Sequence, residues 1–232
     1  MTTQPADFIG LLAKLHLPTG NVEATLDSIV EFACDALHTE LGGVMLAHRD
    51  GSVVSAAVSD QLVSRGDELQ MLVREGPSLS AMDEGHVELV RRTVDDRRWR
   101  AWGPAAHQIG IRSVLSVRLA RTATDPIGSL NVYNLRTDGF SADAIETARI
   151  IARHASMALV AGRKARAIER ALETRASIGH AEGIVMTRYG IDADQASNML
   201  RRDSQAYNVP LRDVARMIVH NRGQAVTTQE RP

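Results

Sequence analysis

The sequence predicts an α+β protein: an antiparallel sheet flanked by helices, then a long connecting helix, then a C-terminal three-helix bundle. Three observations lead to this prediction. Strand-like apolar runs occur in two pairs, helical apolar spacing precedes and separates the pairs, and the stretch 144–175 contains no proline. Helices beside an antiparallel sheet define the α+β class. The 232 residues suffice for one or two domains with ordinary buried cores.

The first helix and a hairpin are predicted within residues 21–59. Apolar residues recur at helical spacing over 21–38, which predicts an amphipathic helix against a core. Two strand-like runs follow, 41–48 and 52–59, with Asp50-Gly51 between them. Because glycine tolerates positive φ, this dipeptide favours a tight turn, and the two runs are predicted to pair as a hairpin.

Between the two strand pairs the pattern changes to helix. The segment 60–74 is predicted to be a helix that Gly76-Pro77 ends, because proline lacks a backbone N–H donor. A short strand is expected at 86–90 and a further helix at 99–108. Four apolar side chains of the first of these helices are expected to face inward, namely Leu62, Val63, Leu69 and Leu72.

A second strand pair is predicted at 113–119 and 127–135, joined by the polar loop 121–125. Successive side chains of a strand point to opposite faces of the sheet. The alternation along the first strand therefore predicts one buried face and one wet face. Val114, Ser116 and Arg118 form one of these faces, and Leu115, Val117 and Leu119 the other.

A long helix is predicted to begin after Ser141, whose hydroxyl suits a helix N-cap, and to extend to at least Arg175. This is long for a helix within one globular domain. It either packs only on the sheet or buries its apolar stripe on a partner. We expect the partner to be a second copy of the chain, in a parallel coiled-coil dimer. The stripe consists of Ile145, Ala148, Ala152, Ala155, Leu159, Gly162, Ile168 and Leu172.

Three helical segments form the predicted C-terminal bundle. The long helix continues to Gly190, Asp192 caps a second helix at 193–207, and a third helix starts after Pro210. Such short helices must bury their apolar residues against one another. The first segment continues through Ile178, Ala181, Val185 and Tyr189. The second is predicted to turn Ala196, Leu200 and Tyr207 inward, and in the third Leu211, Val214, Ala215 and Ile218 recur at helical spacing.

The net charge of −1 conceals an asymmetry along the chain. Residues 1–162 carry 15 Lys and Arg against 20 Asp and Glu, a net −5, whereas residues 163–232 carry 12 against 8, a net +4. A basic segment suits a polyanionic partner, although many solvated helices have a similar excess.

Polar and basic residues of the last two helices share surfaces. Guanidinium groups bind phosphates in a forked geometry, and amide or hydroxyl groups bind unstacked bases and sugar hydroxyls. The alternative is an ordinary solvated face. Arg201, Ser204, Gln205 and Asn208 lie at spacings of three, four and seven, and Arg212 and Arg216 lie one turn apart.

Gly179 and Gly183 lie four residues apart on one face of the preceding helix. Glycine inside an exposed helix costs about 1 kcal/mol relative to alanine. Either the glycines allow close packing against a neighbouring helix, or another backbone, of protein or RNA, approaches them.

The first part of the chain, about 20–162, resembles the GAF family of sensory domains. The resemblance is specific for the fold and does not name a ligand. It rests on Glu75-Gly76-Pro77-Ser78-Leu79, Asp95-Asp96-Arg97-Arg98-Trp99, Gly110-Ile111-Arg112-Ser113-Val114-Leu115-Ser116-Val117 and Ile127-Gly128-Ser129-Leu130-Asn131-Val132-Tyr133.

No cofactor is expected in this GAF-like domain, although a small-molecule ligand of unknown identity fits the family. Relatives beside RNA-binding tails often have cysteine where this chain has Ser78. The single cysteine, Cys34, lies in an apolar run that predicts burial. Haem would need an axial ligand such as His86 or His107, but a lone histidine is more often a surface or hydrogen-bonded residue.

The segment from about 168 to 222 resembles the ANTAR domain, the RNA-binding module of transcription antitermination regulators. The resemblance implies a dimer that binds paired RNA hairpins and prevents a terminator hairpin from forming. Many relatives have lysine where this chain has Glu182, so this carboxylate faces away from RNA, pairs with Arg175 or Arg188, or weakens binding. The matching residues are Arg175, Ile178, Ala181, Gly183, Met186, Ala196, Leu200, Ser204, Gln205, Asn208, Leu211, Val214 and Ala215.

These features predict a cytoplasmic, dimeric RNA-binding antiterminator that the GAF-like domain gates, with an upstream signalling protein as a further partner. The alternative is a sensing or interaction module whose helical tail dimerises or docks a partner without binding RNA. No catalytic motif, export signal or membrane span is present in the sequence, so neither an enzyme nor a membrane protein is expected.

Four parts and one site are predicted. The parts are an N-terminal extension (1–20), a GAF-like domain (21–162, with the connecting helix from about 142), an ANTAR-like domain (163–222) and a flexible tail (223–232). The predicted RNA-binding residues are Arg175, Gly179, Gly183, Arg188, Arg201, Arg202, Ser204, Gln205, Asn208, Arg212 and Arg216.

Overall fold

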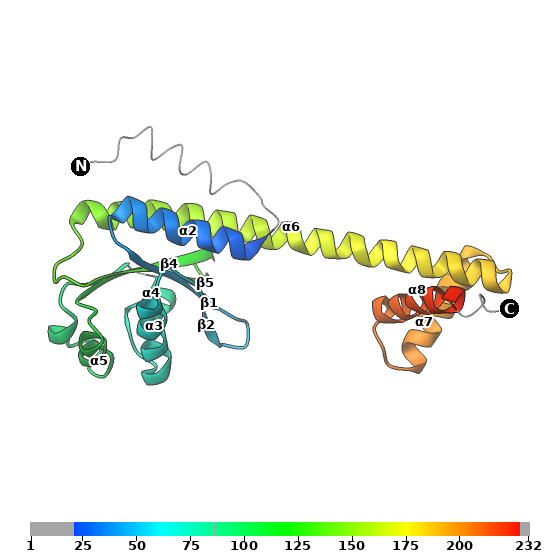
Figure 1. The fold of residues 1–232 in the computed structure, drawn as a ribbon, viewed down its shortest axis with the longest axis horizontal. Coiled ribbons are helices and arrows are strands. Elements are labelled where there is room, and N and C mark those ends of the chain that lie inside the picture. Colours follow the sequence, from blue (N-terminus) through cyan, green and yellow to red (C-terminus); the bar gives the residue numbers. More distant parts are fainter. Residues whose placement is uncertain (1–20, 86, 228–232) are drawn as a thin grey trace, which may run out of the picture. The chain divides into compact units, whose positions relative to one another are not determined.

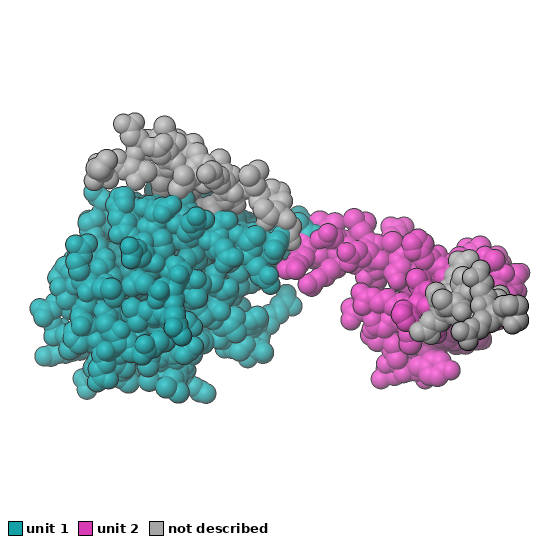
Figure 2. All heavy atoms as spheres, viewed as in Figure 1, with its two compact units in different colours: residues 1–165 teal, residues 166–232 magenta. Residues whose placement is uncertain are grey.

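The structure is a computed structural model that describes residues 21–85 and 87–227, with 222–227 described by their backbone alone. The chain divides into two compact units, residues 1–165 and 166–232 (Figure 2). Helix α6 (Ala142–Tyr189) contributes to both units. The extension predicted at 1–20 lies outside the described residues, as does the end of the predicted tail at 228–232.

A five-stranded antiparallel sheet forms the centre of the first unit, in the order β2-β1-β5-β4-β3 (Figure 1). The predicted hairpin is β1 and β2, and Gly51 in its turn has a φ of 83°. The second predicted pair is β4 and β5. The strands are β1 (Leu41–Ala47), β2 (Val53–Val58), β3 (Val87–Val90), β4 (Ser113–Thr122) and β5 (Asp125–Asn134).

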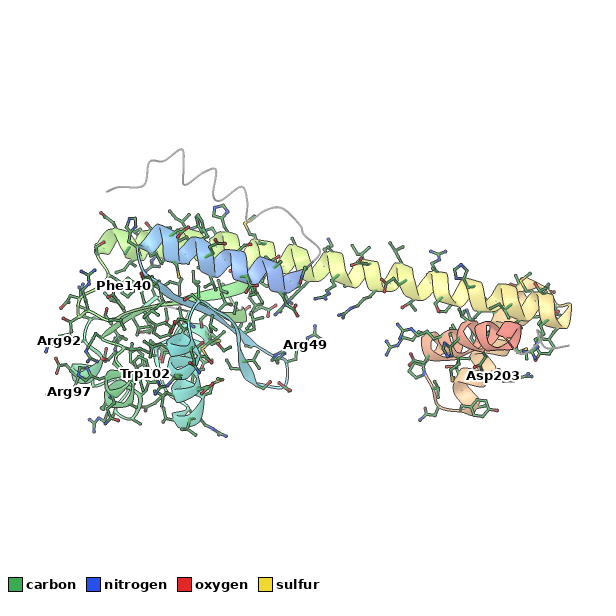
Figure 3. The ribbon with its side chains drawn as sticks, in the orientation of Figure 1. Arg49, Arg92, Arg97, Trp102, Phe140 and Asp203 are labelled. Carbon is green, nitrogen blue, oxygen red and sulfur yellow. The ribbon has the colours of Figure 1, made fainter. Side chains whose placement is uncertain are left out.

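Helices cover both faces of this sheet (Figure 1). Helices α2 and α6 pack on one face, over a core cluster that includes Phe140. Helices α3, α4 and α5 lie on the other face, where a second cluster includes Trp102 (Figure 3). This arrangement confirms the predicted α+β class. The additional helices are α2 (Val22–Leu37), α3 (Gln61–Val73), α4 (Pro77–Glu84) and α5 (Trp102–Gln108).

Two predictions about burial in this unit are wrong. Neither face of β4 is wet: Val114 and Ser116 are 0% exposed, because α3, α4 and α5 cover their side of the sheet. Leu72 was expected to face inward from α3 but is 79% exposed.

Helix α4 is absent from the sequence prediction, which places a break at Gly76-Pro77. Pro77 is instead the first residue of α4. Proline fits this position because the N–H groups of a first helical turn have no partner in the helix. The helix expected at 99–108 begins only at Trp102.

Helix α6 has two apolar faces rather than one stripe. Its residues from 148 to 159 pack against the sheet, whereas Ile168 and Leu172 are 53% and 63% exposed. At about 100° per residue, Ile168 lies roughly 160° around the helix from Ala148. The core therefore accounts for the first face and leaves the second without a partner among the described residues. The buried face consists of Ala148, Ala152, Ala155 and Leu159.

The second unit contains the end of α6, helix α7 (Ala193–Ala206) and helix α8 (Leu211–Thr227). Asp192 caps α7 as predicted, and Gln195 completes a capping box. The α8 backbone continues to Thr227, beyond the predicted start of the tail at 223. The buried core is small and consists of Ala181, Val185, Ala196, Leu200 and Ala215.

The two tyrosines of this unit are not in its core. Tyr189 is 56% exposed and Tyr207 is 76% exposed, so the prediction that Tyr207 faces inward is wrong. Tyr207 is the C-cap of α7, one residue after its last residue Ala206, and lies outside the core cluster that contains Leu200.

Candidate functional site

Helix α7 carries two arginines on the side away from the small core of the second unit. Leu200 faces that core, and Arg201 and Arg202 lie about 100° and 200° further around the helix. Both are exposed, and no ion pair among the described residues includes either of them. Both guanidinium groups are therefore available to bind phosphate.

Helix α8 carries two further exposed arginines that share one acidic neighbour. A guanidinium nitrogen of Arg212 and one of Arg216 each lie 3.7 Å from Oδ1 of Asp213. Solvent-exposed pairs of this kind contribute about 0–1 kcal/mol. Asp213 therefore does little to prevent either arginine from contacting a phosphate.

Two of the polar residues predicted to bind RNA shape the turn between α7 and α8. The hydroxyl of Ser204 donates a hydrogen bond to the backbone oxygen of Val209, at 2.6 Å. Asn208 has a φ of 51°, the left-handed conformation that asparagine tolerates after a helix. Gln205 differs from both, because its side chain is exposed and makes no hydrogen bond among the described residues.

The end of α6 contributes exposed Arg175 and Arg188, and the guanidinium of Arg188 lies 6.0 Å from the ring centre of Tyr189. Glu182, which lies between these two arginines in the sequence, is half-buried. No ion pair in the described part of the chain joins Glu182 to either arginine. Seven positions separate Glu182 from Arg175, which places the two about 20° apart around the helix.

Gly179 and Gly183 are exposed, and a methyl group added to either would meet no described atom within 4 Å. Close packing against the described part of the second unit is therefore not the reason for these glycines. They lie roughly 160° around α6 from the core residues Ala181 and Val185. Whatever approaches them comes from outside the unit.

The exposed tyrosines are candidate RNA-binding residues that the sequence prediction missed. All five described aromatic residues of the first unit are at most 5% exposed, whereas both in the second unit are exposed. Aromatic rings stack on unpaired bases. The position of Tyr207 between the last helical turn and Pro210 is the sequence signal that the inward prediction overlooked. The buried aromatic residues are Phe32, Trp99, Trp102, Tyr133 and Phe140.

A buried polar network lies on the α3–α4 side of the sheet. Asp67 accepts hydrogen bonds from the hydroxyls of Tyr133 and Ser55. Burial raises the pKa of the Asp67 carboxyl from 3.8 to about 6, although these two hydrogen bonds lower it. Burial, together with Asp67, also raises the pKa of Tyr133 well above its ordinary value of 10.

Ser78 belongs to the same network. Its N–H donates to Oε1 of Gln70 and its hydroxyl accepts from Nε2 of Gln70, both at 2.8 Å. On the neighbouring strand β5, the hydroxyl of Ser129 and the amide of Asn131 are buried with no hydrogen-bond partner in the described chain. Such groups favour a small polar ligand or water on this face.

The other candidate cofactor residues have ordinary surroundings. Cys34 is buried, and burial raises the pKa of its thiol, as expected for a structural cysteine. Nδ1 of His107 lies 3.5 Å from the hydroxyl of Thr93. His86 lies outside the described residues. Within the described ranges, no group of acidic, histidine or cysteine residues is placed to hold a metal ion, and no helix is long and apolar enough to cross a membrane.

Family models identify both parts of the chain. A GAF domain model matches residues 19–160 and an ANTAR domain model matches residues 166–219. The chain therefore belongs to the GAF domain family and carries an ANTAR domain after its GAF domain. Both are regulatory domains that are generally not enzymes. No curated protein matches the sequence.

Solved structures share the fold of the first unit. The GAF domain of phosphoenolpyruvate-protein phosphotransferase from Acinetobacter has a TM-score of 0.54 at 13% identity, over 71% of this chain and 98% of that one. Free methionine-R-sulfoxide reductase from Neisseria meningitidis, in complex with its substrate, has a TM-score of 0.55 at 17% identity, over 71% and 95%. A phytochrome photosensory core module from Stigmatella aurantiaca has a TM-score of 0.54 at 8% identity, over 84% and 45%. At such identities the likeness extends to the fold alone.

Proposed function

We propose that the protein is a dimeric RNA-binding regulator of transcription antitermination. The ANTAR domain binds paired RNA hairpins, and the GAF domain gates this binding in response to a small ligand or an upstream signalling protein. The protein acts without enzymatic activity and in the cytoplasm, where transcripts are made. The observation that carries the proposal is the ANTAR domain itself, with its exposed arginines.

The proposed RNA contacts come from all three helices of the ANTAR domain. The arginines contact phosphates, the amide of Gln205 binds a base edge or a sugar hydroxyl, and the ring of Tyr207 stacks on an unpaired base. Ser204 and Asn208 hold the turn that positions these groups. The six arginines are Arg175 and Arg188 of α6, Arg201 and Arg202 of α7, and Arg212 and Arg216 of α8.

The proposed dimer forms through the exposed face of α6. Ile168 and Leu172 supply its apolar side chains. Gly179 and Gly183 follow Leu172 by seven and eleven positions, which places both within about 20° of it around the helix. Open space at both glycines allows a second helix backbone to come close. In this arrangement the glycines serve the dimer. Arg175 lies about 20° around the helix from Ile168, at the edge of the dimer face, and the other arginines lie away from it.

A salt titration of RNA binding tests this function. The full chain is titrated with a two-hairpin RNA at several salt concentrations, by fluorescence anisotropy. Each phosphate contact that is lost lowers the slope of log affinity against log salt by roughly 0.7–0.9. We expect the double variant Arg201→Ala, Arg212→Ala to lower the slope by about two such steps. The control is Arg49→Ala, in the β1–β2 turn of the GAF domain (Figure 3). Equal slopes for the double variant and the parent would refute the assignment.

A second function is favoured by the half-buried Glu182 and by the exposed Ile168 and Leu172. In it, the helical tail dimerises or docks a protein partner and binds no RNA. The same titration separates the two functions. A dimer that binds no hairpin RNA even at low salt would support the docking module and exclude the antiterminator.

A further inference from the structure

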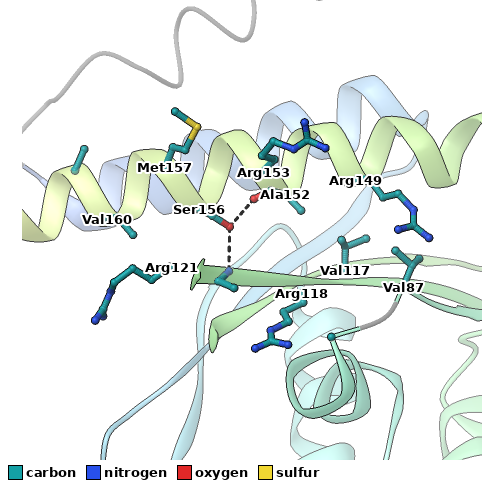
Figure 4. Close-up of a pocket in the computed structure, with 13 residues that line it drawn as sticks. Val87, Val117, Arg118, Arg121, Arg149, Ala152, Arg153, Ser156, Met157 and Val160 are labelled. Carbon is teal, nitrogen blue, oxygen red and sulfur yellow. Dashed lines mark hydrogen bonds between the residues drawn. The ribbon is translucent and has the colours of Figure 1, made fainter. Parts of the chain in front are cut away.

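A groove of about 640 Å³ lies in the GAF domain, between the edge of β4 and helix α6 (Figure 4). Among the described residues, strand β3 pairs with β4 only from Val114 to Val117, and no described strand lies beside the rest of β4, up to Thr122, on that edge. The register of β4 with β5 also shifts around Ala120.

The groove concentrates positive charge in an acidic part of the chain. Among the described residues, four arginines line it, Arg118 and Arg121 from β4 and Arg149 and Arg153 from α6, and no acidic side chain does. Residues 1–162 as a whole carry a net charge of −5. A hollow lined by one sign of charge attracts ligands of the opposite sign.

Two of these arginines have no partner within the described chain. Nε of Arg118 is buried and makes no hydrogen bond, and Gly85 lacks the side chain that would displace this guanidinium. Arg153 is exposed and takes part in no described ion pair. Arg121 and Arg149 form exposed ion pairs with residues outside the groove, at 2.9 and 3.4 Å, each worth about 0–1 kcal/mol. Buried donors in folded proteins normally have a hydrogen-bond partner, so the unpaired Nε of Arg118 is unusual.

The floor of the groove is apolar. Val87 of β3, Val117 of β4 and Val160 of α6 supply it, and Met157 of α6, which is 56% exposed, lies at its rim. The hydroxyl of Ser156 in the lining is already engaged, because it accepts from the N–H of Ala120 at 3.1 Å and donates to the Ala152 oxygen at 2.7 Å (Figure 4). The groove thus combines cations at its rim with an apolar base.

We propose that this groove binds a small amphipathic organic anion, whose acid group contacts Arg149 and Arg153 of α6 and whose apolar body covers Val117 and Met157. The volume lies within the roughly 300–1,000 Å³ typical of small-molecule sites. RNA would satisfy the arginines but has no apolar body for the floor. Residues 1–20 carry one Asp against one Lys, so they do not match the charge of the rim.

Occupancy of this site reaches the ANTAR domain through one helix. Arg149, Arg153 and Met157 belong to α6, which continues without a break to Tyr189. A ligand that bridges β4 and α6 stabilises one position of α6 against the sheet. This regulatory consequence rests on the proposed RNA-binding function, whereas the binding itself does not.

Calorimetric titration of the full chain with dodecanoate, below its micelle concentration, tests the proposal. Dodecyltrimethylammonium has the same tail with the opposite charge, and acetate has the acid without the tail. We expect dodecanoate to bind at least about tenfold more tightly than either, because only dodecanoate matches both rim and floor. Equal binding of the cation, or no binding of dodecanoate, would overturn the proposal.

Variants locate the site. Arg149→Gln, Arg153→Gln and Met157→Gln are each expected to weaken dodecanoate binding about fivefold or more. Arg170→Gln, on α6 outside the groove, should leave binding unchanged. Unchanged binding in both Arg153→Gln and Met157→Gln would overturn the assignment.

Competition identifies other occupants. Dodecanoate affinity that falls as protein concentration rises would mean that a second copy covers the groove. If the affinity for hairpin RNA itself falls in Arg153→Gln by the same factor as the affinity for dodecanoate, the groove is an RNA surface. Either result rejects the small-anion site, and neither depends on whether the ANTAR domain binds RNA as proposed.

Discussion

Tyr207 is the most exposed aromatic side chain of the described residues, at 76%. We expect Tyr207→Ala to weaken binding of a hairpin RNA with an unpaired loop by about 1–3 kcal/mol, because base–aromatic stacking has this magnitude. Anisotropy titration at fixed salt measures the change. The salt slope should stay the same, since no phosphate contact is removed.

The phenylalanine variant is the matched control for Tyr207. Tyr207→Phe keeps the ring and removes only the hydroxyl, so it should bind RNA almost as the parent does. If Tyr207→Ala also binds as the parent does while the parent still binds RNA, the stacking assignment is wrong and the antitermination function is unaffected.

Asp67 makes the stability of the GAF domain depend on pH. Its carboxyl keeps its proton up to about pH 6 in the folded chain, against an ordinary pKa of 3.8. Between these values the folded state binds more protons than the unfolded state, so stability falls as pH rises. The full effect is roughly 3 kcal/mol, from a shift of about two pKa units.

Asp67→Asn tests this dependence, because the amide has nearly the same shape and does not ionise. We expect the unfolding free energy of the parent to decrease relative to that of Asp67→Asn between about pH 4 and pH 7. Urea denaturation at several pH values measures both. A difference between parent and variant that stays constant over this range would contradict a raised pKa for the buried carboxyl.

The exposed face of α6 determines what the helix does beyond the sheet. Leu172→Asp places a charge at the centre of the proposed dimer face and removes about 1.5–3 kcal/mol of apolar burial from each copy. We expect the dimer to weaken by at least about 3 kcal/mol, measured by analytical ultracentrifugation. Arg170→Asp adds the same charge on another side of the helix and should leave the dimer intact. Equal sedimentation of the parent and Leu172→Asp at all concentrations would exclude this interface.

Local patterns predict the elements that have a strong period or a cap. The hairpin depends on Asp50-Gly51, the start of α7 on Asp192, and the end of α6 on Gly190, and all three are where the sequence places them. Helix α4 escapes prediction because its eight residues give no clear period and proline at its first position resembles a stop signal.

Features that depend on distant parts of the chain escape local patterns as well. Ser116 is polar yet buried because α4 packs over β4. The arginines of the ANTAR domain could be predicted from the sequence motif. The hydrogen bond from the Ser204 hydroxyl to the Val209 oxygen could not, because it depends on how the turn between α7 and α8 closes. The groove lies where β4 extends past Val117, the last residue that it pairs with β3, beside α6, an arrangement that no local pattern contains.

At the scale of the whole molecule, α6 is the one element that belongs to both units. If a ligand in the groove between β4 and α6 changes RNA affinity, the effect must depend on how far α6 turns between Val160 and Arg175. An insertion of two alanines after Lys164 turns the ANTAR end of the helix by about 200°, whereas an insertion of eleven residues turns it by only about 20°. The eleven-residue insertion therefore rotates the ANTAR end of the helix less than the two-residue insertion does.

We therefore expect dodecanoate to change the RNA affinity of the parent and of the eleven-residue variant by a similar factor, and to have no effect on that of the two-residue variant. Linkage requires that RNA change dodecanoate affinity by the same factor, so calorimetry and anisotropy must agree. Both variants should bind RNA without dodecanoate, because the ANTAR core from Ala181 to Ala215 is untouched. An equal response in the two-residue variant would show that α6 transmits no rotation, and that the domains communicate through another contact.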